Sequence, residues 1–218
     1  MAPSPQFLFD GPETAPFTVL LGHGAGAAMD SPGMQRMAEA LASAGVRTAR
    51  FEFAYMAARR EGQRRPPPRA ETLCPEYEAA VDALPDSIGR DRRLVIGGKS
   101  MGGRVASLVA DRLHDAGRIA GLLCLGYPFH PVGKPEQPRT AHLATLQTPT
   151  LIVQGTRDPF GTREEVALYR LSPSIRLLWL EDGDHDLRPR KSVSGYTQKD
   201  HLATMAGNVA AWSAGLRP

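Results

Sequence analysis

A serine between two glycines is the part of this sequence that most directly suggests chemistry. Residues 98–102 read Gly-Lys-Ser-Met-Gly, the G-x-S-x-G pattern of a sharp turn that exposes a nucleophilic hydroxyl. Gly98 and Gly102 carry no Cβ, so a tightly bent backbone can pass close to its neighbours there. The pattern predicts that Ser100 is the nucleophile of an acyl-transfer reaction.

The flanking residues favour this interpretation over two alternatives. An apolar strand is predicted at 94–96 and helical spacing follows the turn, a setting that chance matches in a glycine-rich chain seldom have. The Gly-Lys-Ser stretch also resembles the end of a phosphate-binding loop. Arg93 stands where that motif needs its first glycine, so the nucleotide-binding interpretation is rejected.

A serine hydroxyl becomes nucleophilic only when a base takes its proton and a third group orients that base. In folds that use this turn, the acid and then the histidine follow the serine along the chain. Asp158 lies in the loop after the apolar segment 151–153, and His185 lies in the loop after segment 175–180. We predict Asp158 as the orienting acid rather than a plain Asp-Pro turn, and His185 as the base rather than a surface-loop histidine.

Other residues fit these two roles less well. Asp184 and Asp186 flank His185, but side chains adjacent in sequence rarely face one imidazole nitrogen. The remaining histidines precede Asp158 or fall within predicted helices: His23, His114, His130, His142 and His201.

A glycine-rich loop provides the last part of the predicted site. Residues 18–26 read as an apolar strand that runs into His-Gly-Ala-Gly. We predict that the backbone N–H groups of Ala25 and of Met101, the residue after the serine, form an oxyanion hole. The alternative is a plain strand-to-helix turn, because Ser31 and Pro32 follow as a helix start.

Strand and helix patterns alternate along the chain and indicate how these residues are positioned. Strands are predicted at 18–21, 46–53, 94–96, 119–125, 151–153 and 175–180, and helical spacing of apolar residues at 34–41, 77–88, 105–113 and 202–216. The alternation predicts an α/β fold, a doubly wound and mostly parallel sheet with helices on both faces. Ligands bind such sheets at the carboxyl ends of the strands, where Ala25, Ser100, Asp158 and His185 all fall.

These motifs together resemble the α/β-hydrolase superfamily. The resemblance rests on residues 23–26, 98–102, 155–158 and 183–186, and it covers about residues 17–216. It is strongest to the small, lidless dienelactone-hydrolase-like and α/β-hydrolase-like members, although Lys99 before the serine is not the most common choice. The resemblance implies a compact α/β-hydrolase fold without a large lid domain, hydrolysis of an ester, thioester or related acyl group, and no metal or organic cofactor.

Length and composition indicate one α/β-hydrolase domain over residues 1–218. A chain with 42% hydrophobic residues can bury a full core, and a net charge of +3 is too small to indicate nucleic-acid binding. No apolar run approaches the ~20 residues of a membrane span, and the first residues do not resemble a signal peptide. With Cys74 and Cys124 as the only cysteines, we expect no disulfide and a cytoplasmic location.

Two loops interrupt the alternation. Loop 54–74 carries five arginines around three prolines: Arg59, Arg60, Arg64, Arg65 and Arg69. We interpret it as a solvated surface loop, and the alternative is an anion patch for acidic substrates, to which Arg188, Arg190 and Lys191 would add. Segment 127–147 has room for one helical turn and no lid, so we expect an open site.

Four further residues are candidates to contact the substrate. His23 lies in the glycine-rich loop, and Tyr127, Phe129 and His130 follow a strand end, where simple packing is an equal alternative. The leading hypothesis is a serine hydrolase for small or exposed acyl esters, with a small-molecule acyl substrate as its partner and the oligomeric state left open. The alternatives are a thioesterase, a peptidase, or a non-catalytic binding module on the same scaffold.

Overall fold

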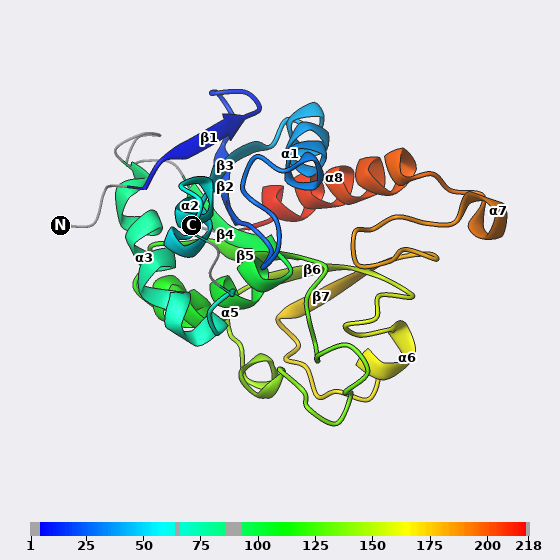
Figure 1. The fold of residues 1–218 in the computed structure, drawn as a ribbon. Coiled ribbons are helices and arrows are strands. Elements are labelled where there is room, and N and C mark those ends of the chain that lie inside the picture. The colour runs from blue at the N-terminus through cyan, green and yellow to red at the C-terminus, as the bar shows by residue number, and fades with distance from the viewer. Residues whose placement is uncertain (1–4, 64–65, 86–92, 217–218) are drawn as a thin grey trace.

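A seven-stranded sheet formed by the described residues runs through the centre of the structure (Figure 1). The structure, a computed structural model, describes residues 5–63, 66–85 and 93–216. The strand order along the sheet is β1-β3-β2-β4-β5-β6-β7. The strands are β1 (Phe7–Asp10), β2 (Phe17–Gly22), β3 (Arg47–Phe51), β4 (Arg93–Lys99), β5 (Gly121–Leu125), β6 (Thr150–Gly155) and β7 (Ile175–Leu180).

All six predicted strands are present, and neighbouring strands run parallel except for β1 and β3. β2, β5 and β6 are buried along their whole length, as expected for strands that helices cover on both faces. β3 and β5 are shorter than predicted, since β3 spans Arg47–Phe51 and β5 begins at Gly121, whereas β2, β4 and β6 extend beyond their predicted ends. The sequence does not predict β1, a partly exposed strand of four residues that depends on its antiparallel pairing with β3.

Helices cover both faces of the sheet (Figure 1). α1 (Pro32–Ser43) and α8 (Gln198–Ala214) pack together on one face, and α3 (Cys74–Ala83) and α5 (Met101–Asp115) pack together on the other. Short helical segments lie in the connections: α2 (Ala54–Arg60), η1 (Ala70–Leu73), η2 (Ala141–Ala144), α6 (Arg163–Val166) and α7 (Lys191–Ser194).

The predicted helical stripes supply a hydrophobic core on each face. Leu41 of α1 and Met205 of α8 belong to one core, and Tyr77 of α3 and Val109 of α5 belong to the other. Burying a large apolar side chain contributes about 1.5–3 kcal/mol, so these stripes fix the helices against the sheet. The helix predicted at 77–88 begins at Cys74 and ends at Ala83, and Ile88 lies outside the described residues.

The loop prediction for residues 54–74 is partly wrong. α2 begins at Ala54, because Tyr55 and Met56 bury their side chains in the core beside α3, and burial favours a helix over a solvated loop. Arg64 and Arg65 lie outside the described residues. Segment 127–147 contains η2 alone, as predicted, so the described chain inserts no lid between β5 and β6. None of the described helices is long and apolar enough to cross a membrane.

Candidate active site

The turn between β4 and α5 holds Ser100 in a strained backbone conformation. Its φ of 52° and ψ of −115° lie outside the regions that residues with a Cβ prefer. The Ser100 N–H donates to the Leu125 carbonyl and the Arg104 N–H donates to the Ser100 carbonyl, both at 3.0 Å. A Cβ at Gly102 would lie 2.2 Å from the Gly22 carbonyl oxygen, so the end of β2 leaves room only for glycine.

Ser100, His185 and Asp158 meet at the carboxyl ends of β4, β7 and β6. His185 Nε2 lies 2.9 Å from Ser100 Oγ, and His185 Nδ1 lies 2.8 Å from Asp158 Oδ2. The serine hydroxyl can donate to Nε2 while the Nδ1–H donates to the carboxylate. This hydrogen-bonded chain can carry a proton from the serine to the imidazole.

The Asp158 carboxylate is fully buried, and both of its oxygens have partners. Oδ1 accepts from the Phe160 N–H at 2.9 Å, and Oδ2 accepts from Gln154 Nε2 at 3.0 Å as well as from His185. The Gln154 amide also donates to two backbone carbonyls, so it fixes the carboxylate to the end of β6. Sequence reasoning missed Gln154, although an amide at the carboxyl end of a buried strand is a usable signal.

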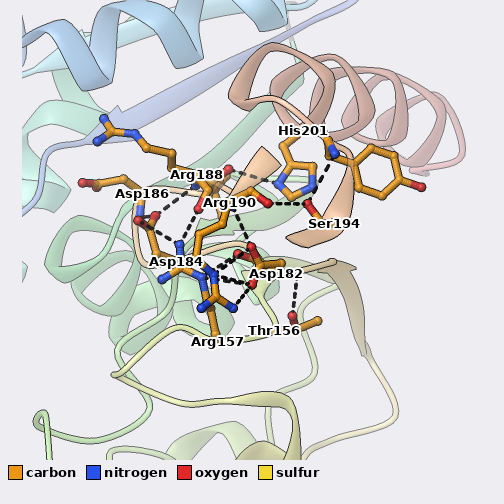
Figure 2. A network of polar contacts seen from close by, with 11 residues as sticks. Thr156, Arg157, Asp182, Asp184, Asp186, Arg188, Arg190, Ser194 and His201 are labelled. Carbon is orange, nitrogen blue, oxygen red and sulfur yellow. Dashed lines mark hydrogen bonds and ion pairs between the residues drawn. The ribbon is translucent and has the colours of Figure 1, made fainter. Parts of the chain in front are cut away.

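Asp182 braces the loop of residues 181–190 that carries His185 (Figure 2). Its carboxylate accepts from the Arg190 backbone N–H at 2.6 Å and from Arg190 Nε at 3.0 Å, and its carbonyl accepts from Arg157 Nε at 2.7 Å. The Arg190 hydrogen bond lowers the pKa of Asp182 to about 2, so the carboxylate stays ionised at neutral pH. Arg157 and Arg190 therefore hold the loop in which His185 lies.

The rest of this loop is held through its backbone (Figure 2). Asp184 Oδ1 accepts from the N–H groups of Asp186 and Arg188, each at 2.9 Å. His201 Nδ1 lies 3.1 Å from the Leu187 carbonyl oxygen, and its ring is buried beneath the loop. His201 therefore supports the loop from α8 and does not line the cleft beside Ser100.

His23 positions the glycine-rich loop and does not line the cleft. Its Nδ1 lies 2.7 Å from the Gly24 carbonyl oxygen, and its Nε2 accepts from the Phe53 N–H at 3.1 Å. These partners suit a neutral ring protonated on Nδ1, and burial lowers the pKa of His23. The C=O and N–H of one trans peptide point in opposite directions, so holding the Gly24 carbonyl also directs the Ala25 N–H. Among the described residues, no hydrogen bond uses the N–H of Ala25 or Met101.

Two residues of α2 also hold the glycine-rich loop and the segment that follows it. The Tyr55 hydroxyl donates to the Ala25 carbonyl at 3.0 Å. The Arg60 guanidinium pairs with Asp30 and with Glu52, each at 2.7 Å. Two carboxylates thus neutralise this arginine, and no described arginine of segment 54–74 lines the cleft. For the described arginines of this segment, the anion-patch alternative is not supported.

Three other residues predicted to contact substrate are packed inside the protein. Tyr127, Phe129 and His130 are at most 1% exposed, and none of them lines the cleft. The Tyr127 hydroxyl donates to the Arg139 carbonyl at 3.0 Å, and His130 Nε2 lies 3.2 Å from Glu165 Oε2. These contacts order the connection after β5, so the packing interpretation holds for these residues.

A cleft of about 480 Å³ lies beside Ser100 and His185. The glycine-rich loop and the start of α1 form one wall, and the Phe160 ring lies 4.3 Å from the His185 ring, measured between centroids. Apolar side chains line much of the rest, together with a few charged ones: Met34, Met37, Leu202, Arg36, Lys99 and Asp186. In the part of the chain that the structure describes, no three His, Cys, Asp or Glu side chains are grouped as metal ligands.

Neither cysteine is placed to act in this site. Cys124 lies fully buried in β5, where burial raises the pKa of its thiol. Cys74 begins α3 on the opposite face from the cleft-lining helices, and both thiols are free. A thiol that stays protonated is a poor nucleophile.

Known proteins share this fold over nearly the whole chain. The model of the alpha/beta hydrolase domain family matches residues 15–214. The chain resembles a dienelactone hydrolase from Anabaena variabilis, with 22% identity, a TM-score of 0.71, and 99% of this chain and 100% of that chain covered. It resembles a lidless α/β serine hydrolase from Xanthomonas campestris, with 16% identity, a TM-score of 0.67, and 100% and 99% covered.

An esterase from Pyrococcus furiosus is a third similar structure. Its identity is 14%, its TM-score is 0.70, and 98% of this chain and 92% of that chain are covered. At these identities the structures show a common fold. Because the family model spans most of its length, this chain belongs to the α/β-hydrolase family.

Proposed function

We propose that this protein is a serine hydrolase that cleaves small or exposed acyl esters through a covalent acyl-enzyme. The observation that carries the proposal is the hydrogen-bonded chain from Ser100 Oγ through His185 to the buried Asp158 carboxylate, with contacts of 2.9 and 2.8 Å. A hydrolase fold that has lost its activity would gain nothing from keeping these three side chains hydrogen-bonded to one another. A dienelactone hydrolase and an esterase among the similar structures support an acyl ester as the substrate.

In the proposed reaction, Ser100 Oγ attacks the ester carbonyl carbon while His185 Nε2 takes the serine proton. Asp158 keeps the other ring proton on Nδ1 and stabilises the imidazolium. The oxyanion accepts hydrogen bonds from the N–H groups of Ala25 and Met101, and losing one such donor typically costs ~3 kcal/mol in the transition state. His185 then protonates the leaving alcohol, and water releases the acyl group by the same steps in reverse.

Covalent labelling with a fluorophosphonate probe tests the proposal. The Ser100 oxygen is expected to bond to phosphorus as fluoride leaves, which adds the mass of the probe to the peptide that contains residue 100. Ser100→Ala is expected to abolish labelling and ester turnover with little effect on folding, because a small hydroxyl at a turn contributes little packing.

Ser107→Ala is the matched control. Ser107 Oγ also contacts a histidine, His142 Nε2, at 2.8 Å, but this pair lies in α5 and η2 and lines no part of the cleft. This variant is expected to label like the wild type. An unlabelled wild type that turns over no ester would favour the non-catalytic module, and labelling that persists in Ser100→Ala would contradict the assigned nucleophile.

A further inference from the structure

Lys99 is a charged residue of the cleft that the proposed reaction does not use. It ends β4 directly before Ser100 and lines the cleft, although its side chain is only 10% exposed. A Cβ on Gly126 would lie 3.3 Å from Lys99 Nζ and 3.4 Å from His185 Nδ1, so the ammonium and the imidazole both pack against Gly126. A buried ammonium has lost most of its hydration, and this burial lowers the pKa of Lys99.

The Asp186 carboxylate offsets only part of the free-energy cost of burying the Lys99 ammonium. Its Oδ1 lies 3.4 Å from Lys99 Nζ, longer than the ~2.7–2.9 Å of a strong charge-assisted hydrogen bond. The Asp186 side chain is 66% exposed, so it can turn into water at little cost. A carboxylate on a bound substrate can therefore take its place without leaving the buried charge unpaired.

The charges that line the cleft favour an anion. Among its described lining residues, Lys99 and Arg36 are basic, and Asp186 is the single acidic residue. α1 begins at the cleft, and the positive end of its helix dipole adds to this potential. By contrast, Arg60 in the arginine-rich segment is already paired with two carboxylates.

We propose that the cleft accepts acyl esters that carry a carboxylate, and that this carboxylate binds the Lys99 ammonium while the ester carbonyl lies at Ser100. The inference rests on the proposed function, since it names the substrate class of the same site. A neutral ester gains only a weaker hydrogen bond to a carbonyl oxygen from Lys99, whereas an anionic ester gains a charge-assisted hydrogen bond between two charged groups. One such bond corresponds to a preference of roughly 10- to 100-fold in kcat/KM.

Matched ester pairs test this preference. Meta-acetoxybenzoate and meta-acetoxybenzamide differ in charge on the alcohol side, and the phenyl half-ester of adipic acid and its primary amide differ in charge on the acyl side. The wild type is expected to prefer the anion by roughly 10- to 100-fold in at least one pair. Equal kcat/KM values within both pairs would overturn the inference and leave the proposed function intact, because the esters would still be hydrolysed. Failure of the proposed function would instead show as no turnover and no probe labelling.

Three variants test whether Lys99 causes the preference for the anionic ester. Lys99→Met keeps the side-chain length and removes the charge, and we expect the anion-to-neutral ratio of kcat/KM to fall roughly 10- to 100-fold. Asp186→Asn removes the competing carboxylate and is expected to raise the ratio. Lys199→Met makes the same change at an exposed residue of α8 and is expected to leave the ratio as in the wild type.

A ratio that is unchanged in Lys99→Met, or that falls equally in Lys199→Met, would overturn the inference, because long-range steering would then explain the preference. If the Lys99→Met variant does not fold, the Asp186→Asn variant tests the inference in its place. If the anion-to-neutral ratio of kcat/KM in Asp186→Asn is equal to or below that of the wild type, Lys99 does not bind the substrate carboxylate.

Discussion

Replacing Asp158 with asparagine is expected to lower kcat for ester hydrolysis by roughly 10⁴-fold and leave the fold intact. Asp158 accepts hydrogen bonds at both oxygens, from the Phe160 N–H and from the donors of Gln154 and His185. An asparagine that keeps its oxygen toward Phe160 must present its NH₂ group to those two donors. Gln154 Nε2 can keep its hydrogen bonds to the Tyr127 and Gly161 carbonyls and lose only the one to residue 158.

His185 can adapt only by moving its proton from Nδ1 to Nε2, so that Nδ1 accepts from the asparagine NH₂. An imidazole with its proton on Nε2 cannot take the proton of Ser100. Steady-state kinetics on a neutral phenyl ester, with circular dichroism as the folding check, measures the effect.

Asp111→Asn provides a matched control for this variant. Asp111 is also a carboxylate that accepts backbone N–H groups, from Gln147 and Thr148, but it lies on α5 away from the cleft. Its substitution is expected to leave kcat within about twofold of the wild type. If Asp158→Asn also kept kcat within tenfold of the wild type, Asp158 would not be the residue that orients His185.

Replacing Gly102 with alanine is expected to destabilise the fold by roughly 3 kcal/mol or more. The new Cβ would lie 2.2 Å from the carbonyl oxygen and 2.4 Å from the carbonyl carbon of Gly22. These atoms belong to β2, which is paired on both sides by β3 and β4, so they cannot move without disturbing the sheet. Thermal and urea unfolding measure the loss, which is expected to appear as a lower Tm or as insoluble protein.

Replacing Gly207 with alanine is expected to stabilise the fold rather than destabilise it. Gly207 is an exposed residue within α8, and a Cβ there would meet no atom within 4 Å. Alanine lowers the conformational entropy of the unfolded chain and favours the helix, so we expect a gain of about 0.5–1 kcal/mol. A Gly102→Ala variant as stable as the wild type would show that the turn can relax away from β2.

The strand, the turn and the helix around Ser100 were predictable from sequence because each is encoded by neighbouring residues. An apolar segment, two glycines and a helical stripe follow one another within residues 94–113, and the backbone strain at Ser100 is a property of the turn itself. The proximity of Asp158 and His185 also followed from the sequence. Both residues come directly after predicted parallel strands, and the carboxyl ends of neighbouring parallel strands lie at one edge of a sheet.

The roles of His23, Arg60 and Lys99 were decided only by the tertiary structure. His23 makes its second hydrogen bond with the Phe53 N–H, and Arg60 pairs with Asp30 and Glu52. Lys99 lines a cleft because residues of α1 and α8 form other parts of its walls. The sequence shows the charge and hydrogen-bonding groups of each side chain. It does not show whether the group faces water, a carboxylate or a cleft, because burial and pairing arise from segments that meet only when the sheet and its helices pack together.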